Sequence, residues 1–577
     1  MRATQYLLSA LHAEGVAHVF LVPGGLIDPF YPDLCDGAGV QPIVAAHEGG
    51  AAYMADGYAR ASGRFGVCFA IGGPGVTNTL TALAAALTDE SPVLLLSGEV
   101  PTDWEGRGGF QDASAAGLND IEILRPVTAF SMEVESPHLV DHHLRRALTT
   151  MLGPDGAPVH LSLPRDLQTA EVGATYRPLF PSAYTPRPLD VPAVDGFWEQ
   201  VVPGRASAEG ARKLAIYAGH GVTRSGAAEE LRAFAERFEI PVATTLKAKG
   251  VLPEDHRLAL GVFGYAGTRH AIETLLSDDV EVLLVLGSGL NQRDTLYWSH
   301  RLRPSKALVQ VNIDPGAISR NFLADVAIVG DCRELLRHLL SARGANLQAL
   351  EAGMSARAAW LETIRASGPR LYDAENCASE SIPIHPARAI AELRRALPRD
   401  AVLLVDSGAH RAFAGHYWEA YGPRQYLSAT NLGPMGWAIP AAIGVKLARP
   451  ELPCAVVTGD GCMLMHGMEV QTAARHHVPV IWAVINNGAL GNVYLRAKRM
   501  GAGPAALTSL PTHDWAGFAR ALGAQGATVE APDQLAPAFE QALAANAPFV
   551  VDVRCGKDFP TPVTPWTQAA KEWMDND

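Results

Sequence analysis

The chain is poor in cysteine, and the few cysteines it has are scattered. Seven occur among 577 residues, at positions 35, 68, 332, 377, 454, 462 and 555, and no two of them form a C-x-x-C pair. An odd, dispersed set argues against a disulfide framework and against a thiolate zinc site. The first residues also lack the long apolar core of a signal peptide. We therefore expect a protein of the reducing cytoplasm.

Long apolar runs and an excess of basic charge are missing as well. No run approaches the length that spans a bilayer, so no membrane partner is expected. The formal net charge is −13, and an acidic surface repels phosphate backbones, which excludes nucleic acid as an expected partner. Hydrophobic residues make up 48% of the chain, which provides apolar material for several packed cores.

Three stretches alternate short β-rich apolar runs with helical patterns, which is typical of α/β domains with doubly wound parallel sheets. The predicted domains cover residues 1–172, 205–343 and 380–560, and a proline-punctuated segment, 177–203, is expected to be a linker. Strands are predicted at 18–21, 67–71, 93–96, 159–162, 214–217, 282–286, 402–405, 455–458 and 480–485. Ligands of such sheets lie beyond the carboxyl ends of the strands, so candidate site residues are sought there.

Oxygen-bearing side chains follow two neighbouring strands of the third stretch. Gly459-Asp460-Gly461 comes directly after one strand, and Asn486-Asn487 ends the next. A strand–helix–strand unit places such strand ends side by side. The carboxylate of Asp460, the amide oxygen of Asn487 and the backbone carbonyl of Ala489 make three donors. Two phosphate oxygens and a water would complete the octahedron that Mg²⁺ prefers.

The glycines of this motif suit a diphosphate. Gly459 and Gly461 allow close approach of the backbone, and a helix expected from Met463 to about His476 presents its N-terminus to the negative charge. An isolated Gly-Asp-Gly is usually an ordinary β-turn. Because Asn486-Asn487 ends the next strand of the same strand–helix–strand unit, a cofactor-binding role is favoured over an ordinary turn.

This pattern resembles the thiamine diphosphate signature: Gly-Asp-Gly, a gap of nearly thirty residues, then Asn-Asn. Glu469-Val470-Gln471-Thr472 is similar to the helix that the family carries inside the motif. The resemblance covers nearly the whole chain and is nearest to the acetolactate synthase branch. It implies thiamine diphosphate and Mg²⁺ as cofactors, and it adds Cys462, Leu490 and Gly491 to the cofactor-binding residues.

The same resemblance makes the first stretch the pyrimidine-binding domain and the third the diphosphate-binding domain. The segments 46–51 and 73–78 carry it. Glu48 is implied to hydrogen-bond the aminopyrimidine ring, where a carboxyl favours the imino tautomer that can accept the thiazolium C2 proton. Gly25 and Asn78 are implied as further cofactor contacts. Taken alone, Glu48 is an ordinary helix-start residue or half of an ion pair.

Two further segments match parts of the family that shape the bound cofactor. Gly433-Pro434-Met435-Gly436-Trp437 resembles the segment that bends it, with Met435 beneath the bend and the Gly433 carbonyl accepting from the amino group. Core packing is the ordinary role of such a methionine. Ser407-Gly408-Ala409-His410 matches a segment that touches the diphosphate, which implies Gly408 and His410. In the family the two halves of the site come from different subunits, so a homodimer or homotetramer with active sites at the interface is implied.

The fate of the substrate depends on a loop that resembles acetolactate synthase. Gly109-Phe110-Gln111-Asp112 matches the loop that points a glutamine at the intermediate, which makes Gln111 a catalytic candidate and Phe110 a substrate contact. Simple decarboxylases carry a His-His pair on the corresponding loop. Here the pairs 142–143 and 476–477 lie in helical patterns elsewhere and are expected at the surface.

We therefore predict a carboligase that decarboxylates a 2-oxo acid and adds the acyl anion equivalent to a second carbonyl, of an oxo acid or an aldehyde. A C–C lyase, 2-oxo acid decarboxylase or oxidase on the same cofactor is the alternative. A nucleotide-sensing or scaffold protein on a degenerate fold is the non-enzymatic alternative, and intact Glu48, Asp460 and Asn487 speak against it.

Some residues of this chain differ from the family pattern at positions that would bind the acceptor substrate or FAD. Arg496 replaces the tryptophan that selects the acceptor, which suggests recognition of a carboxylate, although an exposed arginine without a role fits equally. In the middle stretch, 287–295 aligns with a flavin-contacting segment, but Gly289 replaces an arginine and Asn291-Gln292 replace two aspartates. The Gly219-His220-Gly221 turn also departs from the dinucleotide fingerprint. These changes weigh against FAD, which the resemblance still allows.

Overall fold

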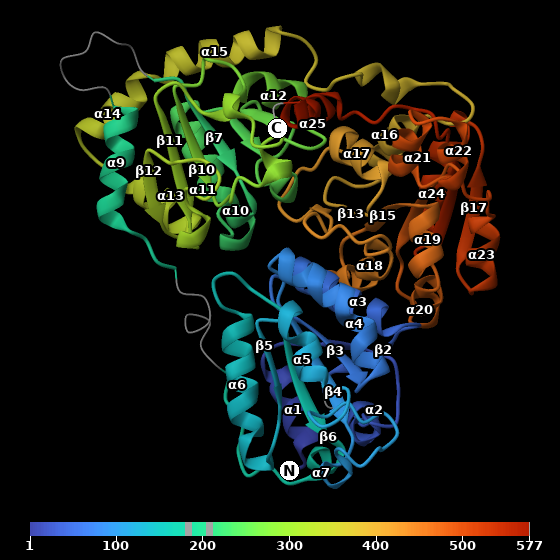
Figure 1. Cartoon of the computed structure of the whole chain (residues 1–577). Coiled ribbons are helices and arrows are strands. Elements are labelled where there is room, and N and C mark those ends of the chain that lie inside the picture. The colour runs from blue at the N-terminus through green and yellow to red at the C-terminus, as the bar shows by residue number, and fades with distance from the viewer. Residues whose placement is uncertain (38, 179–186, 203–211, 576–577) are drawn as a thin grey trace.

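The computed structural model describes residues 1–37, 39–178, 187–202 and 212–575. The chain forms three six-stranded sheets in which all paired strands run parallel. Figure 1 shows them as three bodies, coloured blue to cyan, green to yellow, and orange to red. The predicted fold class, three doubly wound α/β domains, is confirmed.

The first domain has the strand order β2-β1-β3-β4-β6-β5. Its central strand β4 is buried along its whole length, because helices cover both faces of a parallel sheet. The strands are β1 His18–Leu21, β2 Gln41–Val44, β3 Gly66–Ile71, β4 Val93–Glu99, β5 Phe130–Glu133 and β6 Val159–Pro164. The helices are α1 Ala3–Ala13, α2 Tyr31–Cys35, α3 Glu48–Ser62, α4 Pro74–Thr88, α5 Asp120–Leu124, α6 Val140–Met151 and α7 Arg165–Thr169.

The second domain has the order β12-β11-β10-β7-β8-β9. Its strands are β7 Leu214–Ala218, β8 Val242–Thr244, β9 Ala259–Val262, β10 Val282–Leu286, β11 Ala307–Asn312 and β12 Val326–Val329. Its helices are α10 His220–Ser225, α11 Ala228–Phe238, α12 Arg269–Leu275 and α13 Cys332–Ser341, and α14 Ala345–Ala352 and α15 Met354–Ala366 follow. The reversal of strand order between β10 and β7 opens a crevice at the carboxyl edge of this sheet.

The third domain has the order β14-β13-β15-β16-β18-β17. Its strands are β13 Val402–Val405, β14 Tyr426–Leu427, β15 Cys454–Gly459, β16 Ile481–Asn486, β17 Gln525–Val529 and β18 Phe549–Arg554. Its helices are α16 Pro386–Ala396, α17 Ala409–Tyr417, α18 Ala438–Ala448, α19 Asp460–His466, α20 Glu469–Arg475, α21 Gly491–Lys498, α22 Ala502–Leu507, α23 Trp515–Ala521 and α24 Leu535–Ala544. The last helix, α25 Thr564–Asp575, packs against the second domain beside α12 (Figure 1). Strands β15 and β16 are direct neighbours, so the two motif-bearing strand ends meet.

Three expectations about local structure were wrong. The segment 177–203 is not only a linker, because α9 Val191–Val201 lies inside it and buries Phe197 and Trp198 in the core of the second domain. Residues 179–186 and 203 of that segment, and the expected domain start at 205, lie outside the described residues. The helix expected over 463–476 is two helices, α19 and α20, separated at Gly467, whose low helix propensity favours the break.

The third error concerns the histidine pairs. His143 is buried on α6, because it lies on the face that also carries Val140 and Ala147, although His142 is exposed as expected. His476 is half-buried and its Nε2 accepts the N–H of Val44 at 3.0 Å. Among the helices of the described residues, none is both long and apolar enough to cross a membrane.

The first and third domains of one chain pack closely through α3 and α18 (Figure 1). A methyl group at Gly57 would lie 2.1 Å from the Ala441 carbonyl oxygen, and one at Gly444 would lie 1.9 Å from that of Met54. Only glycine permits this approach of the two helix backbones. This packing brings the start of α3, where Glu48 lies, near the third domain.

Candidate active site

Asp460 lies at the join of the two predicted strand ends. It is the first residue of α19, directly after β15, and is 1% exposed. Its Oδ2 accepts the backbone N–H groups of Asn487 and Gly488, both at 2.9 Å, and its Oδ1 accepts the indole N–H of Trp515 at 3.0 Å. The carboxylate is therefore held in one orientation by groups from both strand ends and from α23. The contact with Trp515 was missed, because no motif marks that residue in the sequence.

The electrostatic state of Asp460 suits a cation. Burial raises the pKa of this carboxyl, and hydrogen bonds from Trp515, Asn487 and Gly488 offset part of that rise. In the described part of the chain, no Lys, Arg or His forms an ion pair with it. A bound metal ion would supply the missing positive charge and favour the ionised form.

The remaining two predicted ligands lie on the turn after β16. Asn487 Oδ1 accepts the N–H of Ala489 at 3.2 Å, across a turn made possible by the left-handed backbone of Gly488 at φ +61°. The described residues contain no cluster of three or more His, Cys, Asp and Glu side chains that could hold a metal. The predicted set differs in kind from such a cluster, since it combines one carboxylate with an amide and a carbonyl oxygen.

The two motif glycines are surrounded by other predicted cofactor contacts. A methyl group at Gly461 would lie 2.5 Å from Met435 Cε and 2.6 Å from Leu490 Cδ2, and one at Gly459 would lie 2.9 Å from His410 Nδ1. Any side chain at Gly459 or Gly461 would thus fill the space that these neighbours border. The structure brings these five predicted residues together.

The imidazole ring of His410 borders Gly459 and carries an unsatisfied polar atom. It is 6% exposed on α17, and its Nε2 is buried without a hydrogen-bond partner. Burial, aided by the neighbouring Arg411 cation, lowers the pKa of His410 to about 3, so the ring is neutral. A buried unpaired polar atom is costly unless a ligand satisfies it. Gly408 is the N-cap of the same helix, and Gly491 begins α21, where a methyl group would lie 2.9 Å from Ala409 Cβ.

Cys462 is inside α19 rather than at the edge of the site. Its thiol donates to the Ser407 carbonyl at 3.3 Å, and burial raises its pKa well above the usual value. Its side chain ties α19 to the segment before α17. Any cofactor contact from Cys462 would have to come from its backbone.

Glu48 lies at the start of α3, and its Oε2 accepts a hydrogen bond from Asn78 Nδ2 at 2.9 Å. Within the described residues, no hydrogen bond or ion pair joins Glu48 to the third domain. A carboxylate that does join the start of α3 to the third domain is Glu469, which accepts the N–H groups of Ala46 at 3.1 Å and His47 at 3.2 Å. The family resemblance places Glu469 in the motif helix, but nothing in the sequence indicates its contact with the first domain.

The other predicted site residues are divided between two domains: Gly25, Phe110 and Gln111 lie in the first domain, and Arg496 lies in the third. Gly25 has open space around it, Phe110 is 84% exposed, and Gln111 adopts a left-handed backbone at φ +61°. Arg496 is exposed on α21. One chain therefore assembles the diphosphate half of the predicted site and leaves the other half on its surface.

A cavity of about 340 Å³ lies at the carboxyl ends of β7, β10, β11 and β12, where Glu90 and Asp155 of the first domain and Asn431 of the third also line it. The segment that aligns with a flavin contact borders it, with Gly289 open to Arg320, whose Nη2 donates to Asn291 Oδ1 at 2.9 Å. Two of the substituted residues, Gly289 and Asn291, thus lie at the cavity wall.

Comparisons with known proteins agree with this arrangement. Three family models match: the thiamine pyrophosphate enzyme N-terminal TPP binding domain over residues 1–118, the central domain over 209–339 and the C-terminal TPP binding domain over 406–553. A probable acetolactate synthase large subunit of Methanocaldococcus jannaschii is 34% identical over 96% of this chain and 92% of its own length. The acetolactate synthase large subunit of Corynebacterium glutamicum is 32% identical over 97% of this chain and 87% of its own length.

The acetolactate synthase isozyme 3 large subunit of Escherichia coli is also 32% identical, over 94% of this chain and 92% of its own length. The similarity thus extends through all three domains rather than through the coenzyme motif alone. The chain therefore belongs to the thiamine diphosphate-dependent enzyme family, in its acetolactate synthase-like branch.

Proposed function

We propose that the protein is a carboligase that decarboxylates a 2-oxo acid and adds the acyl anion equivalent to a second carbonyl compound, as the names of its acetolactate synthase relatives suggest. The observation that carries the proposal is the convergence of Asp460, Asn487 and the imidazole ring of His410 near Gly459, with the Nε2 of that ring buried and without a hydrogen-bond partner. This set offers oxygen donors for a metal and a polar contact for a phosphate in one place.

The residues present fit Mg²⁺ and thiamine diphosphate. Asp460, Asn487 and the backbone carbonyl of Ala489 would hold the metal through oxygen, its preferred ligand. Gly459 and Gly461 leave room for the diphosphate, and His410 would hydrogen-bond it. When bound, the coenzyme supplies the electron sink that makes a carbonyl carbon nucleophilic.

The protein groups would bind, orient and move one proton. Glu48 would hold a proton between its carboxyl and the coenzyme ring, with Asn78 fixing its orientation through the 2.9 Å hydrogen bond. Met435 and Leu490, on either side of Gly461, would keep the coenzyme bent and exclude water. Gln111 would hydrogen-bond the substrate, and Phe110 and Arg496 would border it.

Two copies of the chain would complete the site, each lending its Glu48 to the third domain of the other, in a homodimer or homotetramer. Support comes from Glu48, which has no polar contact with its own third domain among the described residues. It also comes from Leu464, Met465 and Met468, which follow the metal motif and are each more than half exposed. Exposed apolar side chains grouped along one short segment are typical of surfaces that a partner covers.

The cysteines and the second-domain cavity bear on the cellular compartment and on FAD. All seven cysteines are free thiols, which fits the cytoplasm. We do not expect bound FAD, because Gly289 and Asn291 border the second-domain cavity in place of the expected flavin contacts. Purified protein without visible flavin absorption is the expected result, and a yellow protein would contradict it.

Product analysis of the holoenzyme tests the reaction. The protein is incubated with thiamine diphosphate, Mg²⁺ and pyruvate or another 2-oxo acid, with and without an aldehyde acceptor. Carboligation releases one CO₂ for every two oxo acids consumed, or one for each aldehyde ligated, and yields a hydroxy ketone product. Release of free aldehyde with one CO₂ per oxo acid would instead establish a decarboxylase, and consumption of O₂ an oxidase.

A further inference from the structure

The segment from Ser428 to Trp437, between β14 and α18, carries the two residues that would shape the coenzyme, Gly433 and Met435. Both ends of this segment contact buried carboxylates of the first domain. Asp89, at the end of α4, holds one end, and Asp56, in the middle of α3, holds the other. In the middle, Leu432 is 46% exposed and Gly433 is at φ +70°, whereas Met435 packs against the buried core that the first and third domains share.

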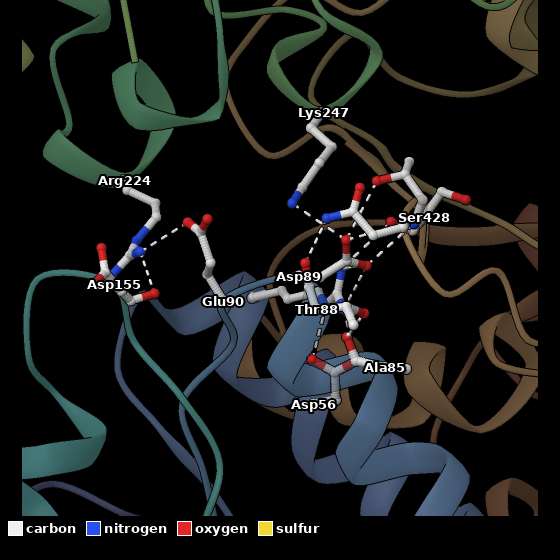
Figure 2. A network of polar contacts seen from close by, with 12 residues as sticks. Asp56, Ala85, Thr88, Asp89, Glu90, Asp155, Arg224, Lys247 and Ser428 are labelled. Atoms are coloured by element: carbon white, nitrogen blue, oxygen red, sulfur yellow. Dashed lines mark hydrogen bonds and ion pairs between the residues drawn. The ribbon is translucent and has the colours of Figure 1, made fainter. Parts of the chain in front are cut away.

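Asp89 accepts hydrogen bonds from several groups of the segment at once. Its Oδ2 accepts the N–H of Thr430 at 3.1 Å, and its Oδ1 accepts the N–H of Asn431 and the hydroxyl of Thr430, both at 3.3 Å. The Asn431 side chain returns a hydrogen bond to the Thr88 carbonyl. Figure 2 shows Asp89 at the centre of this network, between α4 and the segment that contains Ser428.

The other end is held by Asp56 through the indole of Trp437, which donates to its Oδ2 at 2.7 Å. Arg60 joins the two ends. It donates to both oxygens of Asp56 at 2.8 and 2.9 Å, to Asp89 Oδ2 at 3.2 Å and to the Ser428 carbonyl at 3.3 Å. Its guanidinium carbon also lies 4.8 Å from the centre of the Trp437 ring.

The second domain supplies a further cation. Lys247, in the short helix η5 Leu246–Ala248, places its Nζ 3.2 Å from Asp89 Oδ1, so all three domains meet on one carboxylate. Burial alone would raise the pKa of Asp89, but the charges of Lys247 and Arg60 outweigh it and hold the pKa below the usual value. Two carboxylates and two cations balance, as a buried charged cluster requires.

We propose that Asp89 and Asp56 are positioning residues that fix Gly433 and Met435 for coenzyme binding. This inference rests on the proposed coenzyme role of those two residues. Both ends of the segment are bonded to the first domain, and these bonds help to set where Met435 packs on the core. Loosening either end would move the segment relative to Gly461, against which Met435 packs. Small displacements of a binding group are costly when the ligand is rigidly held elsewhere.

The test compares two isosteric changes at buried carboxylates. Asp89→Asn removes the charge at the segment, and Glu254→Gln removes a charge that does not touch it. Glu254 forms a 2.7 Å ion pair with Lys249, accepts the N–H of Ala420 at 2.8 Å and is buried as deeply as Asp89. The dissociation constant of thiamine diphosphate with saturating Mg²⁺ is measured by calorimetry on the purified full chain. We expect about tenfold weaker binding for Asp89→Asn and less than about twofold for Glu254→Gln.

A milder variant covers the case in which Asp89→Asn does not fold. Thr430→Val removes only the 3.3 Å hydroxyl contact and leaves every charge in place. It is expected to weaken coenzyme binding about threefold. Equal weakening by Asp89→Asn and Glu254→Gln would show a general loss of stability and overturn the inference, as would unchanged binding by Asp89→Asn or, where that variant does not fold, by Thr430→Val. A wild-type chain that binds no coenzyme would instead overturn the proposed function first.

Discussion

The indole N–H of Trp515 donates to Asp460 Oδ1 across 3.0 Å, although the two residues are 55 positions apart. Since Oδ2 is already bonded to Asn487 and Gly488, both oxygens of Asp460 are oriented by the protein itself. Partners of this kind, one step removed from a metal, orient its ligand and tune its basicity.

Replacing Trp515 with phenylalanine should therefore weaken metal activation. The ring that packs against His513 and Phe518 is retained, but the donor to Asp460 is lost. We expect the Mg²⁺ concentration for half-maximal activity to rise about tenfold. Trp418→Phe is the matched control, because Trp418 is fully buried and its indole nitrogen has no hydrogen-bond partner. Equal responses of the two variants would contradict the role given to Trp515.

Complementation between inactive chains tests whether the site is shared. Glu48→Gln should remove the proton-holding group, and Asp460→Asn should remove the metal carboxylate, so each variant alone is expected to be inactive. When the two are co-expressed, each mixed dimer should contain one intact site, so about half of the sites in purified mixed dimers should be active. Activity is measured on dimers purified through two different tags. Mixed dimers that stay inactive would mean that each site is built from one chain.

Arg496→Ala tests recognition of a substrate carboxylate. The side chain is exposed on α21, where a guanidinium can form paired hydrogen bonds with a carboxylate. We expect KM for the anionic acceptor to rise about tenfold while kcat changes little. Arg499→Ala, just beyond the end of the same helix, serves as the control. Unchanged KM values for every oxo acid would remove Arg496 from the substrate site.

Asp120 should make stability depend on pH. Burial raises its pKa from 3.8 to about 7; a hydrogen bond from the Gly73 N–H offsets part of this, and the charge of Glu99 adds to it. Between about pH 4 and pH 7 the unfolded chain has released this proton and the folded chain has not, so folding stability falls as pH rises through that window. Asp120→Asn should abolish this pH-dependent loss of folding free energy, which is on the order of 3 kcal/mol.

The measurement is the urea midpoint of the wild-type chain and of Asp120→Asn at pH 5 and pH 8. The wild type should lose more stability than the variant between these two values. Parallel losses would show that Asp120 ionises in the folded protein as it does in water.

Much of the geometry around the proposed diphosphate site could be predicted from the sequence. Apolar runs with the period of strands, separated by helical patterns, predicted the three parallel sheets that the structure contains. Gly459, Asp460 and Asn487 belong to one strand–helix–strand unit, and the right-handed crossover of such a unit brings its strand ends together whatever lies outside it. The break between α19 and α20 was missed because a single glycine weakens a helical pattern without erasing it.

The sequence by itself determined the sheets, the coenzyme family and the joined strand ends, because these follow from periodicity and motifs along short stretches of chain. Only the tertiary structure decided that Trp515 orients Asp460, that Glu469 binds the start of α3, and that Asp89 meets Thr430 across 341 positions. Such contacts arise where two folded surfaces pack. Their partners are chosen by the shape and charge of those surfaces, which no local pattern records.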